Sequence, residues 1–103
     1  MKNKIKKLPS KEIRDLKSSN FWLIRDLWLC NKHINDENNS IIHLNSMMDN
    51  INPFTRIYKE LFKNRNKHLD KLGLLIDLDV RIREDIYNNG KEIMRLRNIR
   101  NGR

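Results

Sequence analysis

The sequence predicts an all-α protein with an antiparallel helical hairpin at its centre. Almost no segment alternates between apolar and polar residues with the period of two that strands require. Apolar residues recur instead at helical spacings, and the glycines and prolines other than Gly90 stand at the expected boundaries of segments. We therefore expect an additional N-terminal helix over about 10–34, a long connection, and a hairpin whose two helices cover about 53–72 and 80–97.

The first helix is expected to begin at Ser10. Serine is a favourable N-cap, and Glu12 in the first turn complements the positive end of the helix dipole. Asn20 interrupts the apolar stripe, so the helix either continues to Ile34 or bends near residues 18–20. The stripe consists of Ile13, Leu16, Leu23, Leu27, Cys30 and Ile34.

The segment 35–52 is rich in Asn, Asp and Ser, which is typical of a connection. Asn52 and Pro53 predict the start of the second helix, since asparagine caps and proline is tolerated in the first turn. Gly73 predicts its end. Residues 1–51 are thus interpreted as an N-terminal helix with its extension.

Residues 52–103 are interpreted as the helical hairpin with a basic tail. A short apolar connection follows Gly73, and Asp77 or Asp79 can cap the third helix. Gly90 weakens that helix by on the order of 1 kcal/mol relative to alanine. The short connection predicts that the two helices run antiparallel.

The charge balance predicts a polyanionic partner. The 103 residues contain 22 Lys and Arg against 13 Asp and Glu, a formal charge of +9. A field of this sign attracts nucleic acid first and an anionic membrane surface second. A membrane-surface helix needs cationic faces that adjoin broad apolar ones, and residues 53–72 place the two on opposite sides.

Little in the sequence points to catalysis, a metal or a cofactor. Cys30 is the single cysteine, so no intrachain disulfide is expected. His33, His43 and His68 have no spacing typical of a zinc site, and no phosphate-binding glycine loop is present. We expect a non-enzymatic protein with no small-molecule substrate and no membrane span.

The second helix carries the clearest candidate binding surface. Its apolar residues fall on one face, and a cationic row interrupted only by Glu60 falls on the opposite one. Such a row can follow a nucleic-acid backbone, because each neutralised phosphate releases counterions. Arg65 lies on the apolar face, where it must snorkel, pair with an acid or reach a ligand. The candidate RNA-binding residues here are Arg56, Lys59, Lys63, Arg65, Lys67 and Lys71.

The third helix adds further cations around an apolar stripe. Arginine suits bidentate phosphate contacts better than lysine does. Arg81 with Asp85, and Glu92 with Arg95, have the spacing of surface ion pairs. The candidate RNA-binding residues in this helix and the tail are Arg81, Arg83, Lys91, Arg95, Arg97 and Arg100.

Three aromatic residues cluster in the first helix. Phe21, Trp22 and Trp28 lie partly off the leucine stripe. Packing against the hairpin is the favoured interpretation, and stacking on a base or on a protein neighbour is the alternative.

Two segments resemble a known family. Residues 57–66, which read Ile-Tyr-Lys-Glu-Leu-Phe-Lys-Asn-Arg-Asn, and residues 79–86, which read Asp-Val-Arg-Ile-Arg-Glu-Asp-Ile, are similar to the helix signatures of the universal ribosomal protein twenty-nine family of the large subunit, particularly its mitochondrial form. Tyr58 and Asn64 stand where that signature has tryptophan and glutamate. The resemblance covers about residues 52–98.

The resemblance implies a structural ribosomal protein. Its expected partners are ribosomal RNA and neighbouring large-subunit proteins near the peptide exit, and its expected location is the ribosome, either mitochondrial or cytoplasmic. The alternative interpretation is a small helical viral or regulatory module that binds protein or DNA.

Overall fold

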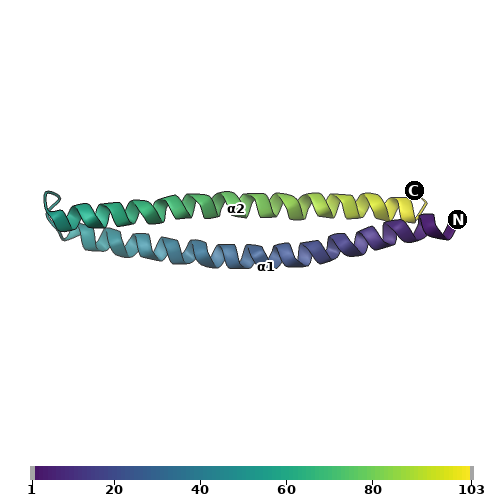
Figure 1. The fold of residues 1–103 in the computed structure, drawn as a ribbon, viewed down its shortest axis with the longest axis horizontal. Helices are drawn as coiled ribbons and strands as arrows, with labels where there is room; N and C mark the ends of the chain where they lie inside the picture. Colours follow the sequence, from purple (N-terminus) through teal and green to yellow (C-terminus); the bar gives the residue numbers. More distant parts are fainter. Residues whose placement is uncertain (1, 103) are drawn as a thin grey trace. The chain divides into compact units, whose positions relative to one another are not determined.

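The chain consists of two long helices joined by a short turn. The computed structural model describes residues 2–102, with the side chains of residues 10–102. Helix α1 spans Lys2–Asp49 and helix α2 spans Arg56–Arg100 (Figure 1). The two helices contact each other as a helical hairpin, and the described residues contain no strand. The predicted all-α class and the presence of a helical hairpin are confirmed.

The position of the hairpin turn differs from the prediction. The segment 35–49, expected to be a connection, belongs to α1, and Gly73 with residues 74–79 lies inside α2. The hairpin is therefore formed by α1 with α2, and not by 53–72 with 80–97. A glycine in a helix costs only about 1 kcal/mol, which tertiary packing of an apolar face readily offsets.

The sequence also misplaced two helix starts. Helix α1 begins at Lys2 rather than at Ser10. Thr55 caps α2, because its Oγ1 accepts a hydrogen bond of 3.3 Å from the Tyr58 amide. Asn52 instead holds the preceding turn, where its Oδ1 accepts a bond of 2.9 Å from the Phe54 amide.

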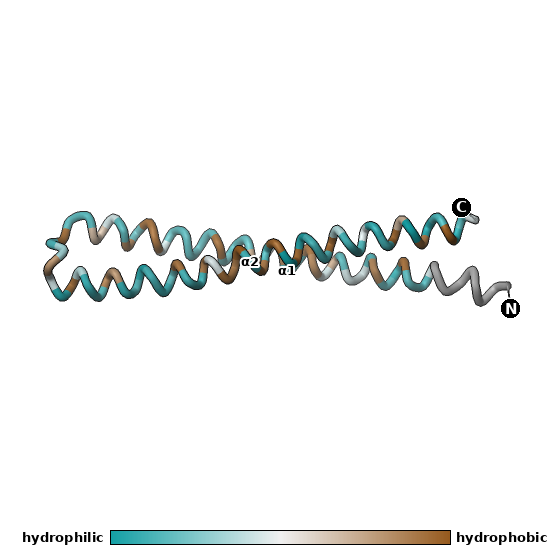
Figure 2. Tube along the Cα trace, turned by 90° about the horizontal axis from the view of Figure 1, so that it is seen from above, coloured by the Kyte–Doolittle hydropathy of each residue, from teal (hydrophilic) through white to brown (hydrophobic). Residues whose placement is uncertain are grey.

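Every buried position, and most half-buried ones, of the described side chains in the two helices fall on a seven-residue repeat. Steps of three and four alternate without a break, which is the spacing of a coiled-coil seam. Figure 2 shows the resulting recurrence of hydrophobic residues between hydrophilic ones. In α1 the seam positions are Ile13, Leu16, Asn20, Leu23, Leu27, Cys30, Ile34, Glu37, Ile41, Leu44 and Met48. In α2 they are Tyr58, Leu61, Arg65, His68, Leu72, Leu75, Asp79, Ile82, Ile86, Asn89, Ile93 and Leu96.

The chain divides into two compact units, each built from a segment of both helices. The first unit combines α1 up to Trp28 with α2 from Val80 onward. Its core is formed by Ile13, Ile93 and Leu96 with Leu16 packed against them. These side chains come from opposite ends of the sequence, so the unit forms only when the two helices meet.

A polar layer accompanies the apolar core of the first unit. Asn89 Nδ2 donates a hydrogen bond of 2.9 Å to Asn20 Oδ1. Asn20 Nδ2 donates in turn to the Ile86 carbonyl at 3.4 Å. An asparagine pair at a seam position fixes register, because any slip leaves both amides without a partner.

The second unit comprises residues 29–79 and contains the turn. Cys30, Leu44 and Met48 are its buried apolar residues. His68 and Glu37 form an ion pair across the two helices, provided that the imidazole is protonated. A polar pair therefore interrupts the apolar seam of this unit, as Asn20 and Asn89 do in the first unit.

Burial changes the acidity of the single thiol in this second unit. Cys30 is 4% exposed, and its Sγ donates to the Leu75 carbonyl at 3.2 Å. Desolvation, and then the negative charge of Asp79, raises the pKa of the Cys30 thiol. The thiolate is the reactive form, so the burial of Cys30 and its raised pKa both slow the reaction of this cysteine.

The asparagine layer generates a stability prediction. Asn89→Leu removes the partner of Asn20 and is expected to lower the free energy of unfolding by about 1–3 kcal/mol. The double variant with Asn20→Leu restores an apolar layer and is expected to be more stable than the single variant, but to lose specificity of pairing. Urea unfolding followed by circular dichroism measures the first effect and sedimentation the second. Wild-type stability in the single variant would refute the role of the layer.

The thiol generates a reactivity prediction. At pH 8 a thiolate-directed disulfide reagent is expected to label Cys30 in the native chain at least about a hundredfold more slowly than in urea, because native labelling must await local opening. The absorbance of the released aromatic thiol measures both rates. Rapid labelling of the native protein would show that the second unit does not bury Cys30.

Candidate nucleic-acid interface

Four cations form a row on the surface of α2 in the second unit. Arg56, Lys59, Lys63 and Lys67 are all exposed. They occupy positions between the seam residues Tyr58, Leu61, Arg65 and His68, on the side turned away from α1. We call these four residues the cationic row.

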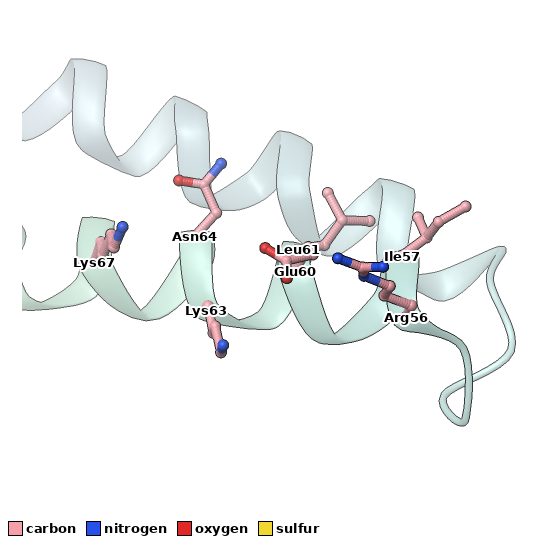
Figure 3. Close-up of a pocket in the computed structure, with 7 residues that line it drawn as sticks. All are labelled: Arg56, Ile57, Glu60, Leu61, Lys63, Asn64 and Lys67. Carbon is pink, nitrogen blue, oxygen red and sulfur yellow. The ribbon is translucent and has the colours of Figure 1, made fainter.

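The cationic row rises regularly along the helix axis. From Lys59 to Lys63 and from Lys63 to Lys67 the axial step is about 6 Å, four residues at 1.5 Å each. Figure 3 shows Lys63 on the side of α2 away from α1, while Leu61 and Asn64 point toward the neighbouring helix. The row presents a linear set of positive charges and no enclosed pocket.

Two shallow depressions meet at Lys63. The first, about 520 Å³, is lined by Arg56, Lys63 and Lys67 with Ile57, Glu60, Leu61 and Asn64 (Figure 3). The second, about 470 Å³, is lined by Lys59, Lys63, Phe62 and Asn66 with Pro53 and Tyr58. Lys63 borders both, so it is the central cation of the row.

Charge is unevenly shared between the two helices of this unit. Residues 56–79 of α2 contain six Lys and Arg and four carboxylates, Glu60, Asp70, Asp77 and Asp79. Residues 29–49 of α1 contain one lysine and three carboxylates. The positive potential of the second unit therefore belongs to α2, and a polyanion is attracted to that helix.

Arg65 does not belong to the cationic row. It is half-buried at a seam position, its Nη1 donates to Asn45 Oδ1 at 3.0 Å, and its guanidinium lies 4.9 Å from the centre of the Phe62 ring. Its buried Nε has no hydrogen-bond partner among the described residues. The sequence left three alternatives for Arg65, which were snorkelling to the surface, a pair with an acid, and contact with a ligand. The structure instead shows Arg65 contacting α1 through the side-chain amide of Asn45.

Lys71 also departs from the row. It lines a shallow depression of about 260 Å³ together with His33, Glu37, Leu74 and Leu75, at the edge where α2 faces α1. A cation near Glu37 is partly neutralised by that carboxylate. Lys71 therefore contributes less than Lys63 to the outward field.

The cations of α2 in the first unit are exposed, and Lys91 and Arg95 contact neighbouring side chains of the same helix. The predicted pair of Glu92 with Arg95 is confirmed, with Arg95 Nε at 3.1 and 3.0 Å from the two carboxylate oxygens. These hydrogen bonds lower the pKa of Glu92 and raise that of Arg95. Lys91 lies 5.4 Å from the centre of the Tyr87 ring.

The remaining arginines of α2 are spread around the helix. Arg81, Arg83, Arg97 and Arg100 are exposed. Arg97 and Arg100 stand in the last turn, where positive charge complements the negative end of the helix dipole. These residues do not form a single row, so the structure groups only part of the predicted set.

The aromatic cluster is on the surface. Phe21 is 63% exposed, Trp22 56% and Trp28 64%, so the predicted packing of these rings against the hairpin is wrong. The seam already takes Asn20, Leu23 and Leu27 from this stretch, which leaves the aromatic positions outside. Their offset from the leucine stripe was the signal in the sequence that could have identified them.

The described residues contain neither a candidate metal site nor a membrane-spanning helix. No group of three or more His, Cys, Asp or Glu side chains among them is placed to hold a metal ion. None of the described helical segments combines the length and apolar character needed to cross a membrane.

Comparison with known proteins gave no relative. No family model, no curated protein and no solved structure matches the chain.

The position of Arg65 generates a prediction that separates it from the cationic row. Arg65→Leu is expected to raise the free energy of unfolding by on the order of 1 kcal/mol, because it removes a half-buried guanidinium with an unsatisfied Nε from the seam. Lys67→Leu, the matched control on the outer side, should change stability by less than about 0.5 kcal/mol. Urea unfolding measures both. A clear loss of stability in Arg65→Leu would show that the bond to Asn45 outweighs the burial penalty.

Proposed function

We propose that this chain is a non-enzymatic RNA-binding protein whose cationic row lies along the phosphate backbone. The observation that carries the proposal is the alignment of Arg56, Lys59, Lys63 and Lys67 on one exposed side of α2. Only Glu60 interrupts these charges, whereas a helix that is merely solvated usually mixes signs. Contacts of this kind position a nucleic acid without reading its sequence.

The particle that we propose as its partner is the large ribosomal subunit, including ribosomal RNA and neighbouring proteins. The support comes from the resemblance of residues 57–66 and 79–86 to the ribosomal family named above. Both segments lie in α2, so the separate hairpin that the resemblance implied within 52–98 is absent. The motif residues and the charge of the chain support this assignment, and a mitochondrial location is proposed on the same motif alone.

A matched pair of lysine variants tests the contact with RNA. Lys63→Gln is expected to weaken binding of purified ribosomal RNA about fivefold and to reduce the slope of log affinity against log salt by about one. Lys11→Gln removes the same charge from an exposed site on α1 that belongs to neither proposed RNA contact, and it should leave both values nearly unchanged. Fluorescence anisotropy of labelled RNA at several salt concentrations measures them. Equal effects of the two substitutions would contradict binding along the cationic row.

The assignment to the ribosome has its own test. A tagged chain is expected to sediment with large subunits in moderate salt, and Lys63→Gln combined with Lys67→Gln should shift it toward the top of the gradient. A chain that leaves the particle fraction while retaining its affinity for DNA or for a protein would instead support a regulatory module.

A further inference from the structure

An exposed aromatic surface stands on α1 within the first unit. Phe21 and Trp28 lie two turns apart along the same line of the helix, and Trp22 lies beside Phe21, about 100° around the helix axis. More than half of each side chain is exposed. Tryptophan is on average one of the more buried residues, so two largely exposed tryptophans six residues apart mark a candidate binding surface. We call these three residues the aromatic patch.

Two rings of the aromatic patch, Phe21 and Trp22, are held in place by their neighbours. Phe21 and Trp22 meet edge to face, with ring centres 5.4 Å apart and planes at 84°. The Arg25 guanidinium lies 5.8 Å from the centre of the Trp22 ring. A ring fixed in this way loses little conformational freedom when a second flat group stacks on it.

Positive charge accompanies the aromatic patch. Arg14 and Arg25 are exposed and lie on the same side of α1 as Phe21 and Trp28, at spacings of seven and of three or four residues. Aromatic rings interleaved with cations are the arrangement by which proteins hold single-stranded nucleic acid, with rings stacked on bases and cations on phosphates.

We propose that the aromatic patch stacks the bases of a single-stranded RNA segment, while Arg14 and Arg25 contact its phosphates. This inference rests on the proposed function and adds the form of RNA that the chain recognises. The cationic row binds backbone of any form, whereas the aromatic patch requires bases that are free to leave their stack. The protein therefore prefers RNA that has an unpaired loop or end.

Charge argues against a second copy of the chain as the occupant. A two-fold dimer places the same surface of both copies together, so the Arg14 and Arg25 charges of the two copies would be brought close to one another. The formal charge of +9 on each chain adds to this repulsion. The same cations favour a polyanion.

Intrinsic fluorescence provides a direct test, because both tryptophans of the chain belong to the aromatic patch. A single-stranded oligouridine of about twelve nucleotides is expected to quench this emission, and a fully paired duplex of equal length is expected to quench it far less. Trp22→Leu and Trp28→Leu should each weaken binding of the oligouridine about tenfold. Trp22→Phe, which keeps an aromatic face, should restore most of the affinity.

The first unit offers a matched control. Tyr87 on α2 is 66% exposed and has Lys91 5.4 Å from its ring centre, so it reproduces the cation and ring of Trp22 and Arg25. Tyr87→Leu should leave the affinity for oligouridine within about twofold of wild type. Circular dichroism of each variant checks that the helices persist, and Trp22→Phe provides the comparison if a leucine variant unfolds.

The outcomes distinguish this inference from the proposed function. Unquenched tryptophans together with RNA binding that still depends on Lys63 would overturn the role of the aromatic patch and leave the proposed function standing. An absence of RNA binding in the wild-type chain would overturn both. Concentration-dependent association that Trp28→Leu abolishes would show that the patch binds a second copy, and would overturn the inference.

Discussion

The seven-residue repeat of the seam is the constraint on which the structure depends. Two helices of 48 and 45 residues bury side chains mainly at two of every seven positions, where steps of three and four alternate. An isolated helix gains nothing from such a narrow stripe, so each is stable only through contact with the other. The polar residues within the seam fix the register of that contact. Asn20 with Asn89, and Glu37 with His68, meet in one register, and a slip would bury polar groups without partners.

The sequence predicted the helical class and much of the apolar stripe of α1, since those signals are local. It misplaced the turn because Asn- and Ser-rich residues 35–49 and Gly73 are typical of connections. Six polar residues at seam positions also conceal the repeat from a prediction based on hydrophobicity: Asn20, Glu37, Arg65, His68, Asp79 and Asn89. Their burial depends on the opposite helix, which no local pattern contains.

The candidate site was predictable to the extent that it lies on one helix. The cationic row follows from helical spacing alone, and the structure leaves it exposed as expected. Arg65 was anomalous on the apolar face, but its bond to Asn45 depends on the pairing of α1 with α2. The exposure of Trp22 and Trp28 was missed for a different reason. Large apolar side chains are ordinarily assigned to a core, and here Leu23 and Leu27 already fill the seam beside them.

The narrow seam also separates the residues that stabilise the fold from those of the proposed binding surfaces. Because pairing uses about two positions in seven, the outer positions of both helices are free to carry other chemistry. In α2 they carry Lys59, Lys63 and Lys67, and in α1 they carry Phe21, Trp22 and Arg25. None of these side chains is a seam residue, so their replacement is expected to leave the pairing of the helices intact. A change at Ile93 or Leu96 would instead lower the stability of the fold, because it weakens the core that holds the two helices together. Folding and the proposed RNA binding thus depend on different residues of the same helical turns.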